Sequence, residues 1–101
     1  MRRTIVFDTE TTGLSSSRDE IISLSIIDYN GNVLFNSYIK PYFHKTWKEA
    51  EAIHGISPED VKDAPYAHEV VDKVREIFNE ADVLITYNGQ FDMGMLERWN
   101  I

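Results

Sequence analysis

The sequence of 101 residues contains no cysteine, so it can form neither disulfide bonds nor thiolate metal sites. Any bound metal ion must therefore take oxygen ligands or the imidazoles of the three histidines, and this favours hard cations such as Mg²⁺ or Mn²⁺. Internal repeats, low-complexity tracts and a linker are also absent. A chain of this length is expected to form one small domain with one core.

The sequence has no long apolar run and little positive charge. Its first residues, MRRTIVFD, include two arginines but only a short apolar stretch before Asp8, which indicates neither a signal peptide nor a membrane span. A cytoplasmic location is the resulting expectation. Ten lysines and arginines stand against 17 aspartates and glutamates, for a net charge of −7. Charge alone argues against a nucleic-acid partner, unless the acids surround bound cations that reset the local field.

Four apolar runs with β-branched or aromatic residues predict strands over 4–7, 21–29, 33–40 and 81–87, the first ending at Asp8. The pair Asn30-Gly31 predicts a hairpin between the second and third strands. Because helices separate the first strand from the fourth, these two can lie parallel and side by side, with the hairpin on the other side. The sequence therefore predicts an α/β fold with a mixed sheet of strand order 3-2-1-4.

Helix signals fall between the third and fourth strands and after the fourth. Thr46 and Glu49 have capping-box spacing, and Gly55 fits a C-terminal stop for a helix over 47–54. Ser57 predicts the cap of a short helix that has Pro58 at its first position. A longer helix is expected to open at Pro65, with apolar residues at 67, 70, 71, 74, 77 and 78. The segment NGQFDMGMLERWN is expected to turn from a loop into a further helix, with Asp92 near its first turn.

Two carboxylates follow the first predicted strand, and a third follows the fourth. Asp8 and Glu10 share a face if the strand continues that far, and ligands of parallel sheets bind beyond the carboxyl ends of the strands. Asp92 then comes within reach of both. Three carboxylates in one crevice would repel and raise one another's pKa unless divalent cations bind. Two such ions ~4 Å apart would clamp the attacking and leaving oxygens of a phosphoryl displacement.

Each of these residues also has a purely structural interpretation. Asp8 and Glu10 fit a solvated strand end, and Asp92 fits a favourable acid near a helix N-terminus. The segment TTGL fits an ordinary turn in which Leu14 makes a core contact.

Three segments in order along the chain favour the functional interpretation. These are VFDTETTGL at 6–14, AIHGISPEDVKDAPYAHEVVDKV at 52–74 and TYNGQFDMGML at 86–96. Together they resemble the motifs of the DnaQ-like (DEDD) 3′–5′ exonuclease superfamily, whose members have the ribonuclease-H-like fold. The resemblance covers essentially the whole chain.

The resemblance implies a role for each matching residue. Asp8 would bridge two metal ions, Glu10 would help to hold the ion on the nucleophile side, and Asp92 would serve the second ion, directly or through water. The Thr11 backbone and Leu14 would hold the 3′-terminal nucleotide, with the leucine wedged at its base. Residues near that pocket would be His54, Asn88 and Phe91. Two alternatives stay open: His54 caps or packs a helix end, and Asn88 caps the last helix.

The resemblance also implies a third motif with a general-base histidine or tyrosine and a fourth acidic ligand, and a fifth strand, none of which has a place in these residues. Residues 1–101 are therefore expected to be a single, C-terminally incomplete exonuclease-like domain, weak or inactive by itself. Three alternatives remain: an exonuclease active within a longer protein or an assembly, an inactive nucleic-acid-binding, metal-binding or structural module, or a truncated product.

The expected substrate is the 3′ end of a nucleic acid, single-stranded and with DNA favoured, although no residue distinguishes DNA from RNA. Without a fifth strand, strand 81–87 would expose an apolar edge that templates association. Met93, Met95, Leu96 and Trp99 would lose partners. A homodimer, or a separate chain that covers strand 81–87, is the expectation.

Overall fold

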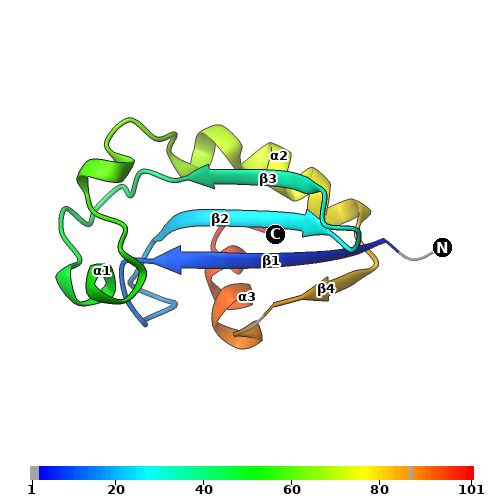
Figure 1. Ribbon diagram of the computed structural model, residues 1–101, viewed down its shortest axis with the longest axis horizontal. Helices are drawn as coiled ribbons and strands as arrows, with labels where there is room; N and C mark the ends of the chain where they lie inside the picture. Colours follow the sequence, from blue (N-terminus) through cyan, green and yellow to red (C-terminus); the bar gives the residue numbers. More distant parts are fainter. Residues whose placement is uncertain (1–2, 87) are drawn as a thin grey trace.

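The computed structural model describes residues 3–86 and 88–101 (Figure 1). Its elements in chain order are β1 (Thr4–Thr11), β2 (Ile21–Asp28), β3 (Val33–Tyr38), α1 (Lys48–His54), the 3₁₀ turn η1 (Glu59–Val61), α2 (Ala67–Glu80), β4 (Val83–Ile85) and α3 (Gly89–Glu97). The sheet has the order β3-β2-β1-β4, with β1 antiparallel to β2 and parallel to β4. The predicted α/β architecture and strand order are confirmed. In the described part of the chain, no helix is long and apolar enough to cross a membrane.

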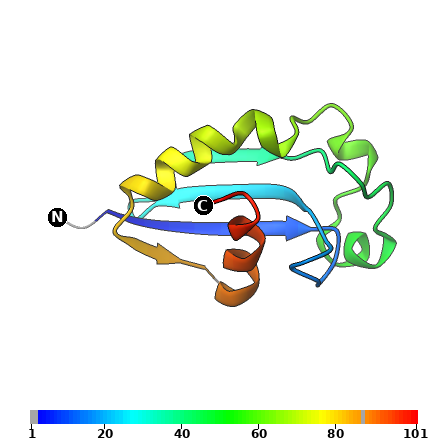
Figure 2. The ribbon, with the colours of Figure 1, turned by 180° about the vertical axis from the view of Figure 1, so that it is seen from behind.

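One face of the sheet is covered by α2 and α3, which lie in front of the strands in Figure 2. The core forms between this face and the helices, with Phe7 of β1 edge-on to Phe78 of α2 at a ring-centroid distance of 5.1 Å. Ile5, Phe7, Thr9 and Thr11 alternate as buried residues along β1. Because side chains alternate along a strand, Asp8 and Glu10 belong to the opposite face.

Strand β1 runs four residues further than its apolar run predicts. Its pairing with β2 continues through Asp8↔Ser25 and Glu10↔Ser23 to Thr11, with a register irregularity after Glu10. The expected strand end at Asp8 is wrong because backbone pairing with β2 holds the polar segment in the sheet. This extension places both carboxylates on one face of a continuous strand.

Strand β4 is shorter than the predicted strand 81–87 and is partly exposed. It comprises Val83–Ile85, and Leu84 and Ile85 are 42% and 44% exposed. Tyr87 lies outside the described residues. Within the described chain β4 pairs only with β1, so its second edge and part of its side-chain surface have no neighbour that could bury them.

The C-terminal helix is better packed than expected. Met95 and Leu96 are buried, and Met93 and Trp99 pack against the same core, so the prediction that these four lose their partners is wrong. The chain after α3 turns back onto α2, where the Arg75 guanidinium donates to the carbonyl oxygens of Trp99 at 3.1 Å and Asn100 at 3.3 Å. These bonds keep the end of the chain on the core.

The helix ends match the sequence signals unevenly. Gly55 ends α1 in the left-handed conformation with φ of 77°, as predicted. The capping box of Thr46 is wrong, because the N-cap is Trp47, whose indole N–H donates instead to the Ile56 carbonyl at 2.7 Å. The Ser57 hydroxyl accepts the Asp60 N–H at 3.2 Å as a cap should, but only one 3₁₀ turn follows. Helix α2 begins two residues after Pro65, at Ala67.

The predicted hairpin is confirmed, with a loop longer than the Asn30-Gly31 pair. It spans residues 29–32, and Gly31 takes a φ of 88° that favours glycine. Both Asn30 and Asn32 donate their backbone N–H to Asp28 Oδ1 at 2.9 Å. The Asn32 side-chain and backbone bonds lower the pKa of Asp28, so the ionised carboxylate is what fastens this turn.

Candidate active site

All eight site residues expected from the sequence line one cleft of about 710 Å³ at the carboxyl end of β1. In Figure 1 this is the end of β1 at which α1 lies. We call it the carboxylate cleft. The residues expected from the sequence are Asp8, Glu10, Thr11, Leu14, His54, Asn88, Phe91 and Asp92, and they are joined by Thr9, Thr12, Gly13, Asp19, Trp47, Lys48, Glu49, Ala50 and Ile53.

Asp8 and Glu10 are the electrostatic centre of the cleft. Asp8 is exposed to the cleft, yet the surrounding protein removes enough water to raise the pKa of its carboxyl, and the nearby Asp92 raises it further. Partial burial likewise raises the pKa of Glu10, with added repulsion from Asp8 that is offset in part by His54. Both groups therefore resist ionisation, and a cation between them would relieve the repulsion.

Asp92 reaches the cleft from the first turn of α3 and is 3% exposed. The Thr9 hydroxyl donates to its Oδ1 at 2.6 Å, and the Thr86 hydroxyl donates to its Oδ2. Both carboxylate oxygens are thereby satisfied without a cation. Among the described residues no three acidic or histidine side chains lie close enough to form a metal-binding cluster. Asp92 thus shares the cleft and the electrostatics of Asp8 and Glu10 but is held on threonine hydroxyls.

His54 joins the end of α1 to the end of β1. Its Nδ1 accepts the Ile56 N–H at 3.1 Å, which leaves the proton on Nε2, and Nε2 donates to the Thr11 carbonyl at 3.0 Å. His54 therefore packs the end of α1 against β1, but it caps no carbonyl of α1, whose C-cap is Gly55. It also forms part of the cleft wall. Asn88 occupies the N-cap of α3 but makes no side-chain capping bond.

The loop after β1 presents Leu14 to the cleft. Asp19 accepts the Thr12 hydroxyl at 2.8 Å and the Ser15 N–H at 2.9 Å. A Cβ at Gly13 would lie 2.5 Å from the Asp19 carboxylate, so a larger residue here would displace the carboxylate from its hydrogen bonds to Thr12 and Ser15. With the loop held in this way, Leu14 is 87% exposed. Leu14 is therefore not a core contact, and sequence reasoning missed Asp19, because no local pattern announces a loop residue that folds back on its own turn.

A set of hydrogen bonds that the sequence did not indicate joins the end of this loop to the segment before α1. Glu20 is 8% exposed and accepts the backbone N–H groups of Tyr42 at 2.6 Å, Phe43 at 3.1 Å and His44 at 3.0 Å. His44 Nδ1 lies 2.8 Å from Glu20 Oε2, and His44 Nε2 lies 3.3 Å from Asp19 Oδ1. Burial alone would raise the pKa of Glu20, but these hydrogen bonds lower it overall. The partners are more than 20 residues apart in the chain, so only the fold reveals them.

The donor set of the carboxylate cleft suits a hard divalent cation. It combines carboxylates that repel one another with hydroxyl and carbonyl oxygens, and it contains no sulfur ligand. The exposed side chains of Leu14 and Ile53 add apolar surface to the same cleft. A cation held beside apolar side chains can bind a ligand with both a phosphate group and a base.

Comparison with known families and sequences gives consistent results. Residues 5–100 match the family RNase T, described as exonuclease. DNA polymerase III subunit epsilon of Rickettsia conorii is 36% identical over 99 residues, covering 93% of this chain and 42% of that protein. DNA polymerase III PolC-type of Bacillus subtilis is 35% identical over 95 residues, covering 91% of this chain and 6% of that protein. The chain thus spans less than half the length of these relatives.

Comparison with solved structures identifies the fold. Exonuclease I of E. coli in complex with a dA16 oligonucleotide superposes with a TM-score of 0.84 at 19% identity, covering 98% of this chain and 23% of that one. The metal-free form of the E. coli enzyme with single-stranded DNA gives a TM-score of 0.83 with the same coverage. The predicted ribonuclease-H-like fold is confirmed.

Proposed function

The chain belongs to the RNase T exonuclease family, within the DnaQ-like (DEDD) superfamily, and on this basis we propose that it is a 3′–5′ exonuclease domain that hydrolyses phosphodiester bonds of DNA with the help of divalent cations. The observation that carries the proposal is the pair Asp8 and Glu10, which have raised pKa values on one strand face. Asp92 lies in the same cleft. The alternative interpretation of Asp8 and Glu10 as a solvated strand end does not account for a third carboxylate, Asp92, that is buried in the same cleft.

Mg²⁺ or Mn²⁺ is the proposed cofactor, two ions in the full family site. Asp8 would bridge the two ions, Glu10 would hold the nucleophile-side ion, and Asp92 would serve the second. Because both Asp92 oxygens already accept threonine hydroxyls, water-mediated contact fits this residue best. When bound, the ions would supply charge neutralisation at the scissile phosphate and a more acidic water molecule.

The 3′-terminal nucleotide would occupy the rest of the carboxylate cleft. Leu14, which is 87% exposed, would wedge against the base, and Thr11 would hold the nucleotide through its backbone. His54, Asn88 and Phe91 would form the surrounding wall. Single-stranded DNA is the favoured substrate because the relatives are DNA polymerase III proteins and the superposed exonuclease I structures contain single-stranded DNA. Such a role would place the domain with DNA in the cytoplasm.

The 101 residues by themselves are proposed to hydrolyse DNA only slowly. They hold three of the expected carboxylates, and no histidine stands in the cleft as a free general base, since His54 uses both ring nitrogens in the protein. Loss of a general base costs about 10² to 10⁴ in rate. The alternative function, an inactive module that binds nucleic acid or metal, is favoured by one observation: the described carboxylates form no ready three-ligand cluster.

The exposed edge of β4 is the proposed contact for a further chain. Leu84 and Ile85 are more than two-fifths exposed, and within the described chain the second edge of β4 pairs with no strand. Open strand edges template association. We propose that a second copy, or a separate polypeptide, covers the segment 81–87; light scattering at high micromolar concentration tests this, and a strictly monomeric mass would contradict it.

The test of function uses single-stranded DNA labelled at its 5′ end, with Mg²⁺ or Mn²⁺, against Asp8→Ala and Glu10→Ala. The expected result is slow, metal-dependent shortening from the 3′ end that both variants abolish. Glu59→Ala is the matched control, because Glu59 is an exposed carboxylate that pairs with Lys62 and does not line the cleft. Shortening that survives Asp8→Ala would refute the proposal. Metal-dependent binding without shortening would favour the inactive module.

A further inference from the structure

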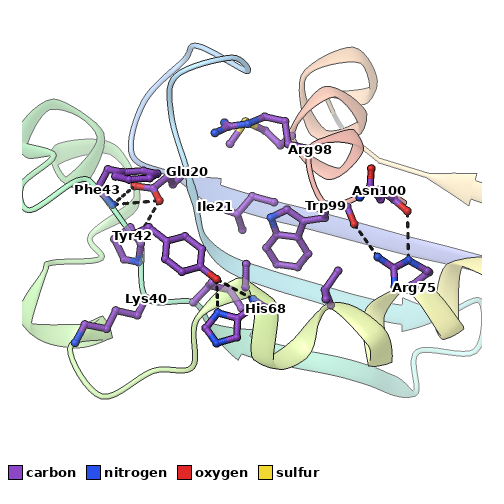
Figure 3. A pocket seen from close by; sticks show the side chains of 15 residues that line it. Glu20, Ile21, Lys40, Tyr42, Phe43, His68, Arg75, Arg98, Trp99 and Asn100 are labelled. Carbon is purple, nitrogen blue, oxygen red and sulfur yellow. Dashed lines mark hydrogen bonds between the residues drawn. The ribbon is translucent and has the colours of Figure 1, made fainter.

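A second cavity, of about 330 Å³, lies on the helix-covered side of the molecule between residues 39–43, α2 and the turn after α3 (Figure 3). Its volume lies at the lower end of the range of about 300–1,000 Å³ for small-molecule sites. We call it the Trp99 pocket. The apolar part of its wall includes Ile21, Val71, Met95 and Trp99. None of its lining residues lines the carboxylate cleft.

The charged groups of the Trp99 pocket are mainly cationic, in a chain of net charge −7. Lys40, Arg75 and Arg98 line it, against the single carboxylate of Glu20. Glu20 is already satisfied by backbone N–H groups and His44. Arg75 pairs with Asp72 at 3.0 Å. Arg98 donates to the carbonyl oxygens of Ser16 and Asp19, and no carboxylate of the described chain forms an ion pair with it or with Lys40. Lys40 and Arg98 are thus the two cations of the pocket without a carboxylate partner in the described chain, and they outnumber the single ionised carboxylate of Glu20.

The rings of Tyr42 and His68 form another part of the same wall, and Tyr66, which does not line the pocket, stacks on both. Tyr42 stacks on Tyr66 with ring centroids 4.9 Å apart and planes 10° from parallel, and it stacks on His68 at 5.8 Å and 24°. The Tyr42 hydroxyl accepts the backbone N–H of His68 at 3.0 Å and is hydrogen-bonded to His68 Nδ1, which fixes the stack (Figure 3). Tyr42 is 48% exposed. Lys40 Nζ lies 5.5 Å from the centre of the Tyr66 ring. Fixed rings beside cations suit a ligand with a planar base and a phosphate.

We infer that the Trp99 pocket binds a nucleotide, with the base against Trp99 and Tyr42 and the phosphate near Arg98. This inference builds on the proposed function. Arg98 contacts the backbone of the loop 12–20, and the same loop presents Leu14 and Asp19 to the carboxylate cleft. A single strand with its 3′ end in the cleft can therefore pass over this loop and place an upstream nucleotide in the pocket. A free mononucleotide has the same chemistry, so the test includes both sources.

The experiment measures binding without metal, in EDTA, so that no hydrolysis takes part. The full chain is titrated with thymidine monophosphate and with a thymidine octanucleotide, and tryptophan fluorescence is recorded. Trp99 lines the pocket, whereas Trp47 lines the carboxylate cleft; the part of the fluorescence change that Trp99→Phe removes is therefore the signal of the pocket. Lys40→Gln and Arg98→Gln should each weaken octanucleotide binding roughly fivefold to hundredfold. Each lost phosphate contact should also reduce the slope of the logarithm of the binding constant against the logarithm of the salt concentration by about 0.7.

Lys73→Gln is the control, since Lys73 is exposed on α2 and does not line the pocket. If the two pocket variants weaken binding of the octanucleotide only, the ligand of the pocket is an upstream nucleotide of the DNA strand. If they weaken binding of thymidine monophosphate equally, the ligand is a free mononucleotide. If neither ligand changes the Trp99 fluorescence, or if Lys40→Gln binds as the control does, the inference is wrong. If Arg98→Gln does not fold, binding by Lys40→Gln compared with the control decides whether the inference holds. Because the assay contains no metal, its outcome is independent of whether the chain hydrolyses DNA.

Discussion

The carboxylate cleft and the Trp99 pocket lie on either side of the loop 12–20 and have opposite charge. Five carboxylates and one lysine line the cleft, whereas one carboxylate, one lysine and two arginines line the pocket. The net charge of −7, taken as an average, argues against nucleic acid as a ligand. Its distribution supports the opposite conclusion, because the acids gather where cations would bind and the cations gather beside aromatic rings.

Each cavity also contains one buried carboxylate, and the two are stabilised differently. Glu20 accepts three backbone N–H groups and contacts His44, which lowers its pKa and ties two loops together. Asp92 accepts two threonine hydroxyls, whose rotation costs little. The first arrangement ties two loops together through rigid backbone donors, whereas the second uses hydroxyl groups that could rotate away from Asp92 to free its oxygens for the proposed cation.

The largest effect is expected from Glu20→Ala, which should lower the free energy of unfolding by at least about 3 kcal/mol, because it removes the acceptor of three backbone N–H groups and one hydrogen bond to a charged group contributes about 1.5–3 kcal/mol. The folded pKa of Glu20 is lowered, so its contribution is present above the unfolded pKa of about 4.3 and is lost as the pH falls through the folded value. Urea unfolding at several pH values measures both the loss of unfolding free energy and its dependence on pH. Glu59→Ala is the control, and an equal change in both variants would refute this role.

Thr9→Val is expected to cost about 2 kcal/mol, since it removes one of the two donors from a buried carboxylate and keeps the shape of the side chain. Thr46→Val is the matched control, because Thr46 is exposed and its predicted capping bond is absent. Urea unfolding of the two variants decides. If Thr9→Val is as stable as wild type, Asp92 does not depend on its hydroxyl partners.

Asp8→Asn should raise the metal-free melting temperature at pH 7. The folded pKa of Asp8 is raised by burial and by Asp92, so the ionised group destabilises the fold, and stability falls as the pH rises from about 3.9 through the folded value. The gain should therefore vanish at acidic pH. Asp63→Asn, at an exposed position outside the cleft, should show no such gain. A lower melting temperature for Asp8→Asn at pH 7 would contradict the repulsion.

Leu14→Ala is expected to change the free energy of unfolding by less than about 0.5 kcal/mol, because the side chain is 87% exposed. It should nevertheless weaken binding to the 3′ end of single-stranded DNA several-fold, measured by fluorescence anisotropy without metal. Val33→Ala removes another exposed apolar side chain, on β3, and should leave binding unchanged. Equal binding by the two variants would remove Leu14 from the substrate site.

The strand order and the meeting of three carboxylates at one edge of the sheet could be predicted from local signals in the sequence. The other five expected residues of the cleft came from the family resemblance. The apolar runs mark β1 and β4, the helices between them require a parallel pair, and their carboxyl ends then meet. The strand lengths could not be predicted in this way. β1 is extended by its pairing with β2, and β4 is shortened where it has only one neighbour in the described chain.

The contacts that shape the loops and the Trp99 pocket were beyond sequence reasoning. Glu20 and His44 meet across 24 residues, and Arg98 reaches the loop residue Asp19 across 79. Met95, Leu96 and Trp99 were expected to be unpartnered, because the return of the chain onto Arg75 leaves no local pattern. Such contacts depend on tertiary placement, which a single sequence does not reveal.

The most direct test of the central claim, that the carboxylate cleft is a divalent-cation site, is Mn²⁺ binding measured by electron paramagnetic resonance with the melting temperature as a second readout. Wild type and Glu59→Ala should bind Mn²⁺ weakly, at one site, and melt at a higher temperature when it is present, because the ion binds only the folded state. Asp8→Ala and Asp92→Ala should lose both responses. No binding by wild type at millimolar Mn²⁺, or the same binding and the same melting shift in Asp8→Ala, would contradict the claim.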